Sequence, residues 1–181
     1  MLVSIITVNF NAGDLLTQSI QSVLSSTVEV EVLVADNAST DDSIEHLINS
    51  VHDPRLFIHK NTANIGFAKA NNALIPKAKG DYLLFLNPDC IIQPDTLESM
   101  LDELKHWPKV GMAGCLIKNA DNSEQAGCRR RVPTPWRTMV RIFRLNKLFK
   151  DNPKFQDVSL IDTPLPRTPV LLEAISGAFM L

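Results

Sequence analysis

The sequence predicts an α/β protein with a mostly parallel sheet and helices on both faces. Short apolar segments alternate with segments whose apolar residues recur at helical spacing. The short segments are apolar throughout instead of at every second position, which is typical of strands that are covered on both sides. Alternating strands and helices of this kind indicate an α/β architecture.

Length, charge and cysteine content narrow the kinds of protein that this sequence can encode. With 181 residues and a net charge of −2, the chain is long enough for one domain with its own core, and its charge argues against a nucleic-acid partner. The three cysteines, Cys90, Cys115 and Cys128, are odd in number and lack metal-ligand spacing, which favours a reducing compartment. Without a signal peptide or a membrane-spanning apolar run, a cytoplasmic chain, free or peripheral to the inner face of a membrane, is expected.

The first half of the sequence contains four expected strands. Each is a short apolar run that ends in polar or turn-forming residues, and they are Leu2–Val8, Val30–Ala35, Leu56–His59 and Tyr82–Leu86. The expected helices between them are Leu15–Leu24, Ile44–Val51 and an alanine-rich segment from Gly66 to Ala78, interrupted near Pro76. Ser39 and Asp42 have the spacing of a capping box before the second helix.

The second half is less regular. A helix is expected over Leu97–His106 and a strand over Val110–Ile117, followed by a turn-rich stretch at Asn119–Gly127. From Arg129 the sequence is basic and punctuated by proline. A strand-like pattern returns at Val170–Leu181.

Polar residues follow three of the expected strands. Ligands of parallel sheets bind beyond the carboxyl ends of the strands, so the loops beginning at Asn9, Asp36 and Asn87 should converge on one crevice. Carboxylates at Asp36 and Asp89 suit hydrogen bonds to a base or ribose, or a hard cation held against phosphates. Taken singly, each carboxylate is explained as well by turn formation or helix capping.

Four segments together resemble family 2 glycosyltransferases of the GT-A fold, which has a Rossmann-like sheet. The resemblance covers nearly the whole chain. The four segments occur in the family's order and approximate spacing, and they are Val3–Asn11 (VSIITVNFN), Val34–Asp41 (VADNASTD), Asn61–Asn72 (NTANIGFAKANN) and Phe85–Asp89 (FLNPD). The resemblance implies a single domain over residues 1–181. Residues 1–118 would be its nucleotide-binding half and residues 119–181 the start of its acceptor-side region.

The resemblance also implies a donor site and a cofactor. The donor is a nucleoside-diphosphate sugar, and the residues implied to bind it are Thr7, Asn9, Asp36, Asn37, Gly66, Asn71, Asn87 and Asp89. Asp89 would hold a divalent cation, Mg²⁺ or Mn²⁺. Asn87 replaces the first aspartate of the usual Asp-x-Asp motif, which removes one charge and implies weaker metal dependence. The Asn-Pro-Asp form resembles rhamnosyltransferases and favours a dTDP-rhamnose donor.

The same resemblance implies inverting transfer to a polysaccharide or lipid-linked acceptor in the building of the bacterial cell surface. The family's catalytic base follows a segment similar to Ile175–Leu181, where this sequence ends. The catalytic residue is therefore unknown and expected C-terminal to Leu181, and little transfer is expected of this chain alone. Glu173 is interpreted as a surface or structural carboxylate.

Residues 129–150 combine eight basic residues with apolar ones at helical spacing, which predicts a basic amphipathic helix. Such a helix suits peripheral contact with an anionic membrane and a lipid-linked acceptor. Packing of its apolar face against protein is an equal alternative. For the whole chain, a non-catalytic nucleotide-sugar-binding module or a degenerate remnant stays open. A dehydrogenase-like protein is disfavoured because no Gly-x-Gly-x-x-Gly follows the first strand.

Overall fold

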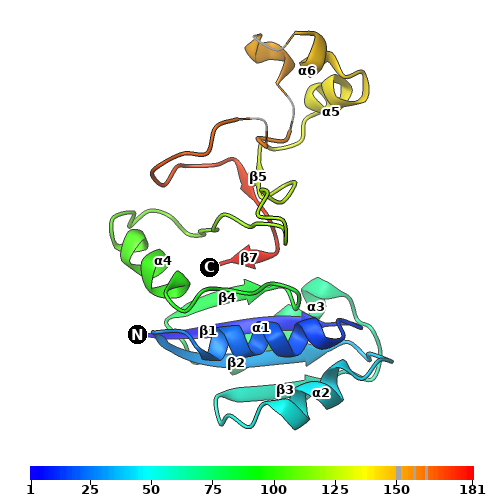
Figure 1. Ribbon diagram of the computed structural model, residues 1–181, viewed down its shortest axis with the longest axis vertical. Coiled ribbons are helices and arrows are strands. Elements are labelled where there is room, and N and C mark those ends of the chain that lie inside the picture. Colours follow the sequence, from blue (N-terminus) through cyan, green and yellow to red (C-terminus); the bar gives the residue numbers. More distant parts are fainter. Residues whose placement is uncertain (150–151, 157, 162) are drawn as a thin grey trace. The chain divides into compact units, whose positions relative to one another are not determined.

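The computed structural model describes residues 1–149, 152–156, 158–161 and 163–181. The chain divides into two compact units, residues 1–113 with 177–181, and residues 114–176 (Figure 1). In the described residues, no helix combines the length and apolar character that crossing a membrane requires. The assignment of donor and acceptor roles to residues 1–118 and 119–181 stays a prediction.

The first unit is built on a five-stranded sheet in the order β3-β2-β1-β4-β7. Its strands are β1 (Leu2–Asn9), β2 (Glu29–Asp36), β3 (Leu56–Lys60), β4 (Tyr82–Leu86) and β7 (Phe179–Met180). The first four run parallel, and β7 joins β4 in antiparallel orientation. The predicted mostly parallel sheet is confirmed.

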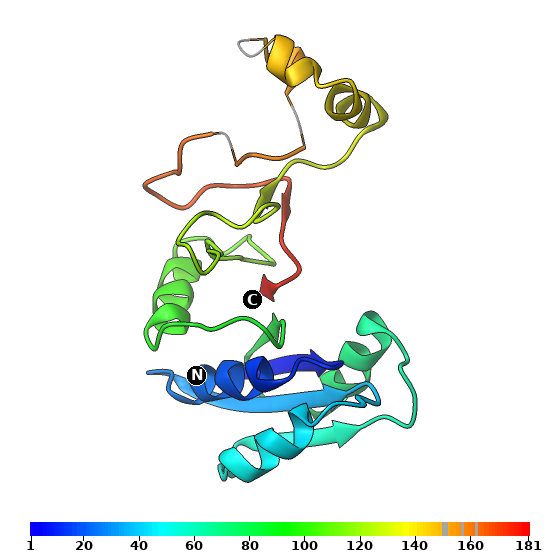
Figure 2. The same cartoon turned by 45° about the vertical axis from the view of Figure 1, so that its right-hand side comes forward.

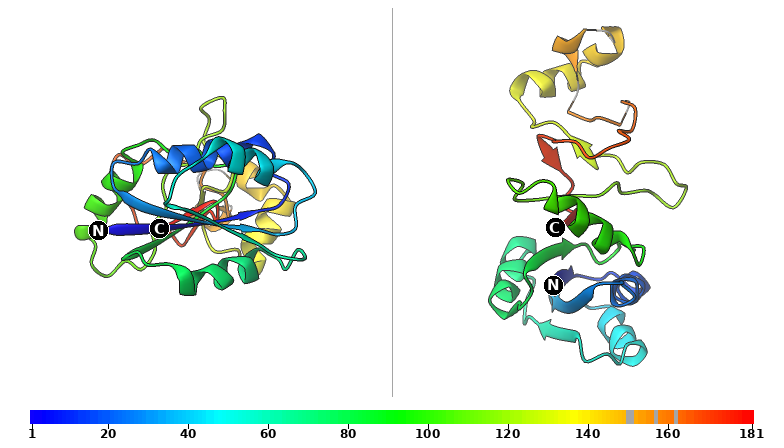
Figure 3. Two further views of the ribbon diagram at one scale, coloured as in Figure 1. Left: turned by 90° about the horizontal axis from the view of Figure 1, so that it is seen from below. Right: turned by 90° about the vertical axis from the view of Figure 1, so that its left-hand side faces the viewer.

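Helices cover both faces of this sheet. Helices α1 (Asp14–Leu24) and α2 (Ser43–Ser50) lie side by side on one face, and α3 (Phe67–Leu74) lies on the other (Figures 2 and 3). Alternate residues of a strand point to opposite faces, so β1 and β2 contribute side chains to two cores, one under α1 and α2 and one under α3. The core under α3 consists of Ile6, Val8, Leu33, Ala35, Ala70 and Leu74.

The interruption expected near Pro76 is confirmed, whereas the expected start of the second helix falls differently in the structure. The alanine-rich helix ends at Leu74 and continues only as a 3₁₀ turn, Ile75–Lys77, because Pro76 has no N–H to donate. The predicted capping box at Ser39 is wrong. The Ser39 hydroxyl instead donates to Asp36 Oδ1 at 2.5 Å, and α2 begins at Ser43 after an Asp42 cap without a side-chain hydrogen bond.

The predicted strand at Val110–Ile117 is also wrong. After α4 (Thr96–Lys105) the chain is irregular, and residues 110–117 form no strand. Ala113 alone exchanges two backbone hydrogen bonds with Leu181, at 2.8 and 3.0 Å. The segment crosses from the first unit into the second at Ala113, so its residues do not share one sheet.

The second unit contains short elements. Strands β5 (Arg129–Arg130) and β6 (Ala174–Ile175) pair in antiparallel orientation, and α5 (Pro135–Ile142), α6 (Leu145–Leu148) and a 3₁₀ turn, η2 (Pro153–Phe155), lie between them in the chain. The strand-like pattern at Val170–Leu181 therefore yields two dipeptide strands, β6 and β7, in different sheets.

The prediction of one continuous helix over residues 129–150 is wrong, because two short helices, α5 and α6, lie in this segment. The Thr134 hydroxyl caps α5 by accepting from the Arg137 N–H at 3.2 Å, so the helix starts only at Pro135. Arg144 has φ of 52°, a left-handed conformation that separates α5 from α6. Lys150 lies outside the described residues.

Gly80 is placed where no side chain fits. A Cβ built there would lie 2.5 Å from the Ser4 backbone nitrogen and 2.8 Å from the Leu2 carbonyl oxygen, so the loop before β4 packs directly on β1. Gly80→Ala is expected to destabilise the chain by about 1–3 kcal/mol, as overpacking does. Urea unfolding followed by Trp107 fluorescence in a Trp136→Phe background measures this loss. Gly111→Ala, where a Cβ meets nothing within 4 Å, is the matched control. Equal midpoints for the two variants would contradict the prediction.

Candidate functional site

The carboxyl ends of the four parallel strands bring the polar residues of the first unit to one edge. Asn9 and Asp36 are register partners at the ends of β1 and β2, and Lys60 pairs with Asp36 at the end of β3. Asn87 follows directly after β4. The juxtaposition expected at the loops beginning at Asn9 and Asp36 is therefore present.

Asp36 and Asn9 form the centre of a buried polar cluster. Asn9 is fully buried and donates through Nδ2 to Asp36 Oδ1 at 2.9 Å and to the Ser43 hydroxyl at 2.8 Å. Asp36, which is 6% exposed, also accepts from the Ser39 hydroxyl through Oδ1. Its Oδ2 receives only a 3.3 Å bond from the Ser39 N–H, so that oxygen keeps most of its capacity to accept a further donor.

The loops after β1 and β2 are tied together around this cluster. Asn11 is held at φ of 55°, and its Oδ1 accepts from the Thr40 N–H at 2.8 Å. In return, Asp41 Oδ2 accepts from the Gly13 N–H at 2.9 Å. These bonds lower the freedom of both loops, and the bonds from Ser43 and Gly13 hold the pKa of Asp41 below its usual value. The edge near Asp36 is thus largely preorganised.

A pocket of about 520 Å³ opens beside Asp36. Ile44 and Ile48 of α2 contribute an apolar side. The polar side chains that line the pocket are those of Asp36, Ser39, Asp41, Glu45, Asn49, Lys60 and Asn61. This volume falls in the range of small-molecule sites. A planar ring could lie along the apolar side while its polar edge meets the Asp36 carboxylate.

Two more predicted residues support this edge from within. The Asn37 backbone N–H donates to the Asn9 carbonyl at 2.9 Å, and its side-chain oxygen accepts from Asn61 at 2.9 Å. Thr7 is fully buried, and its hydroxyl has no hydrogen-bond partner in the part of the chain that the structure describes. Contact between Thr7 and a ligand therefore needs a local rearrangement.

Gly66 precedes α3 and Asn71 lies on it, and this helix covers the opposite face of the sheet from α1 and α2. Gly66 precedes the helix with φ of 84°, a conformation that glycine adopts without strain. Asn71 is 5% exposed and donates to the Phe67 carbonyl at 3.0 Å. Neither residue lines the pocket beside Asp36.

The Asn87–Asp89 loop is a separate part of the edge. The Asn87 N–H donates to the Ala178 carbonyl at 2.9 Å, so the short segment that carries β7 anchors the start of this loop. Asn87 is half-buried, whereas Asp89 is exposed. Among the described residues, no group of three His, Cys, Asp or Glu side chains is arranged to hold a metal ion. The oxygen ligands of Asn87 and Asp89 nevertheless suit a cation such as Mg²⁺, which binds through one or two carboxylates plus substrate phosphates.

His46 of α2 connects this helix to α1 on the same face of the sheet. Its Nδ1 lies 2.6 Å from Asp14 Oδ1 at the start of α1, and its Nε2 lies 3.2 Å from Asp42 Oδ2. The hydrogen bond that the imidazole donates to Asp14, followed by the charge of Asp42, raises the pKa of His46. Protonation of His46 therefore favours the folded state.

This arrangement gives a pH prediction. The stabilisation by His46 should be fully present below the ordinary histidine pKa of about 6.5 and should fade as pH rises through the raised pKa of the folded state. His46→Gln should therefore flatten the change in thermal midpoint over that window. Because the pair is exposed, the effect is small. His52→Gln is the control, and an equal change in both variants would refute the role of His46.

Among the residues that line the pocket, the sequence singled out only Asp36 as a site residue. Lys60 ends β3 and carries a cation to the edge, a position that the strand register alone could have indicated. Ser39 and Asn61 lie within the quoted motifs but were not singled out as site residues. Ala38 has φ of 58°, a conformation that alanine does not signal in a sequence.

The family of the chain follows from residues 4–160, which match the family described as glycosyl transferase family 2. The chain belongs to this family. Among its curated relatives, the Escherichia coli UDP-Glc:alpha-D-GlcNAc-diphosphoundecaprenol beta-1,3-glucosyltransferase WfaP is 38% identical over 89 residues, which cover 49% of this chain and 35% of the relative. An N-acetylglucosaminyl-diphospho-decaprenol L-rhamnosyltransferase of Mycobacterium tuberculosis is 28% identical over 138 residues, covering 70% of this chain and 44% of the relative. This family 2 chain thus spans less than half the length of either enzyme.

Solved structures confirm the GT-A fold of the family 2 chain. Staphylococcus aureus TarS in complex with UDP-GlcNAc superposes with a TM-score of 0.53 at 24% identity, over 59% of this chain and 32% of that one. The mannosyltransferase PcManGT from Pyrobaculum calidifontis, in complex with GDP-Man and Mn²⁺, gives 0.54 at 24% identity, over 65% and 35%.

Proposed function

We propose that this family 2 chain binds a nucleoside-diphosphate sugar together with Mg²⁺ or Mn²⁺, for inverting sugar transfer to a polysaccharide or lipid-linked acceptor at the cytoplasmic face of a membrane. The observation that carries the proposal is the Asp36 carboxylate, which ends β2 and lines a pocket of nucleoside size. Asp36 Oδ2 accepts the N–H at the edge of a pyrimidine base. Lys60 lines the same pocket and offsets negative charge there.

We propose that the other polar residues at this edge of the sheet bind the sugar and its diphosphate. Asn87 donates to a ribose or phosphate oxygen, and Asp89 holds the cation, which stabilises charge on the departing diphosphate when bound. Gly66 and Asn71 complete the predicted nucleotide-sugar-binding set with Thr7, Asn9 and Asn37. We propose dTDP-rhamnose as the donor because Asn87-Pro88-Asp89 has the Asn-Pro-Asp form and one relative is a rhamnosyltransferase.

The proposal assigns no catalytic base to residues 1–181. Glu173 accepts from Arg137 Nη1 at 2.6 Å and from the Val132 N–H at 2.9 Å. These hydrogen bonds, the one from Arg137 foremost, lower the pKa of Glu173. A carboxylate held in its charged form by a guanidinium is a poor proton acceptor. Glu173 therefore fits the structural role expected for it.

Calorimetric titration with UDP, dTDP and their sugars, each with and without Mn²⁺, tests the donor site. Tighter binding of dTDP and dTDP-rhamnose than of the uridine compounds, strengthened by Mn²⁺, is the expected result. Preference for UDP would overturn the rhamnose donor but keep the site. Failure of every nucleotide to bind a folded chain would overturn the proposed function.

Asp89→Asn tests the cation. The variant removes the only charge of the Asn87–Asp89 loop, so the strengthening of dTDP binding by Mn²⁺ is expected to fall about tenfold, while binding without metal stays nearly unchanged. Titration of both forms with and without Mn²⁺ measures the difference. Asp95→Asn, at the exposed start of α4, is the control. Undiminished Mn²⁺ dependence in Asp89→Asn would place the cation elsewhere.

The alternative of a non-catalytic binding module has one observation in its favour. Asn87 stands where the family's usual motif has aspartate, so this loop offers the cation a single carboxylate. Nucleotide binding that Mn²⁺ leaves unchanged would favour the binding module over the transferase.

A further inference from the structure

Helix α5 and its neighbour α6 expose an unusual amount of apolar surface. Met139, Ile142, Phe143 and Leu148 are 47%, 68%, 64% and 73% exposed, and Val140 is the buried residue of α5. Trp136, Met139 and Phe143 recur at i, i+3 and i+7, which places them on one side of the helix. Most apolar side chains of the helix are therefore exposed to solvent instead of being packed against the second unit.

The sequence segment that forms this face carries charge of one sign. From residue 129 to residue 149 the sequence contains no aspartate or glutamate. Arg141, Arg144 and Lys147 are exposed, and within the described part of the chain none of them takes part in an ion pair. Apolar side chains bordered by uncompensated cations are complementary to one kind of partner, a surface with a negative exterior and an apolar interior.

Aromatic contacts that do not involve Ile142, Phe143 or Leu148 hold the segment in place. The Trp136 indole N–H donates to the Lys154 carbonyl at 2.7 Å, and Phe155 lies 5.7 Å from the Trp136 ring and 4.7 Å from the Phe149 ring, measured between centroids. These contacts join α5, the end of α6 and η2. The outer side chains, Ile142 and Phe143, can therefore be replaced without removing this small aromatic core.

We propose that α5 and α6 form a docking surface for an anionic phospholipid bilayer. Ile142, Phe143 and Leu148 enter the interface between head groups and acyl chains, and Arg141, Arg144 and Lys147 meet the phosphates. Trp136 is suited to the same interface because its ring is apolar and its N–H is already satisfied. Bilayer binding by this surface does not depend on the proposed function. Only its biological role does, which is to hold the chain near a lipid-linked acceptor.

Co-sedimentation with vesicles tests this surface. The full chain is expected to bind phosphatidylcholine vesicles that contain phosphatidylglycerol, to release them at high salt, and to leave pure phosphatidylcholine vesicles unbound. The triple variant Arg141→Gln, Arg144→Gln, Lys147→Gln should weaken binding about a hundredfold, since each cation near an anionic surface strengthens binding about fivefold. Lys79→Gln, Lys109→Gln, Lys118→Gln removes the same charge from exposed positions elsewhere and is the matched control.

The apolar contribution has its own readout. In Trp107→Phe chains, Trp136 is the remaining tryptophan, and brominated phospholipid should quench its fluorescence. Ile142→Ser with Phe143→Ser should reduce vesicle binding about tenfold or more at unchanged thermal midpoint. Equal loss in the control triple variant, equal binding to pure phosphatidylcholine, or self-association through this face without vesicle binding would each overturn the proposal. Nucleotide titration without lipid reports separately on the donor site, so failure of one leaves the other standing.

Discussion

Asp36→Ala is expected to weaken nucleotide binding about 10- to 100-fold. The carboxylate is buried at the end of β2, and its Oδ2 is the oxygen left largely unused by the protein. A hydrogen bond to a charged group contributes about 1.5–3 kcal/mol, which corresponds to this range of affinity. Titration with dTDP and UDP measures the change.

Asp36→Asn separates recognition from folding. The amide keeps the volume of the side chain and can still accept from Asn9, but it presents N–H donors where a base N–H needs an acceptor. Binding should fall nearly as far as in Asp36→Ala, whereas the thermal midpoint should drop less. Asp102→Asn on α4 controls for the loss of one negative charge. Unchanged affinity in both Asp36 variants would remove this residue from the donor site.

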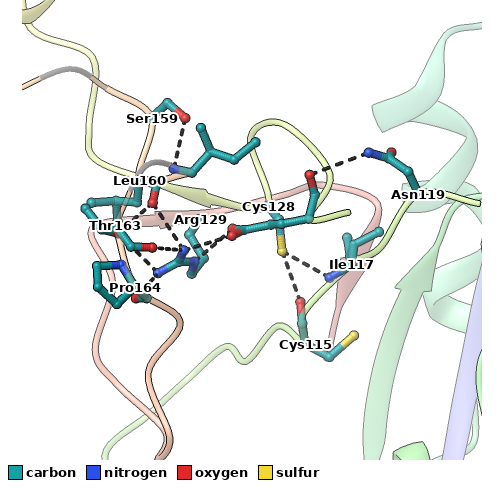
Figure 4. A network of polar contacts seen from close by, with 11 residues as sticks. Cys115, Ile117, Asn119, Cys128, Arg129, Ser159, Leu160, Thr163 and Pro164 are labelled. Carbon is teal, nitrogen blue, oxygen red and sulfur yellow. Dashed lines mark hydrogen bonds and ion pairs between the residues drawn. The ribbon is translucent and has the colours of Figure 1, made fainter. Parts of the chain in front are cut away.

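Arg129→Met is expected to destabilise the second unit by about 3 kcal/mol. Arg129 and Glu124 form a bidentate pair, with both bonds at 2.8 Å and each side chain only 10% exposed. The remaining guanidinium donors bind the carbonyls of Leu160, Thr163 and Pro164 (Figure 4). Removing Arg129 leaves a buried carboxylate unpaired and takes the donor from the carbonyls of Thr163 and Pro164, which is the costly way to break such a pair.

The reporter for this loss is Trp136, observed in a Trp107→Phe background during urea unfolding. Arg129→Met combined with Glu124→Met should recover part of the lost stability, because the unpaired carboxylate disappears. Arg137→Met is the exposed counterpart, and its loss should be much smaller because solvent screens the Arg137–Glu173 pair. A double variant no more stable than Arg129→Met would show that the carbonyl contacts, not the ion pair, dominate.

The pair also has a pH dependence. Hydrogen bonding to Arg129 lowers the pKa of Glu124. A depressed carboxyl pKa contributes stability that is present above its unfolded value, about 4.3, and is lost as pH falls through the folded value. The wild-type second unit should therefore lose stability as pH falls below about 4.3, whereas Arg129→Met chains, which lack the pair, should lose less over the same range in urea unfolding.

The sequence by itself determined the first unit. Its apolar runs and helical spacings predicted β1 to β4 and α1 to α3, because short local segments with a clear period carry their own structure. The motifs at Asn9, Asp36 and Asn87 predicted the edge on which polar groups gather, because parallel strands place their following loops together. For the same reason, family membership could be read from residues close to those strand ends.

Only the tertiary structure decided what these residues do to one another. The pairing of β7 with β4 and the bond from Asn87 to Ala178 join segments about ninety residues apart, and no local pattern encodes such a contact. Lys60 enters the pocket through the register of β3, and Ser39 turns to Asp36 instead of capping α2. Val110–Ile117 has the composition of a strand but lacks a partner ladder beyond Ala113. Strand pairing and buried hydrogen bonds depend on residues that are close in space but far apart in the chain. Local sequence patterns therefore do not determine them.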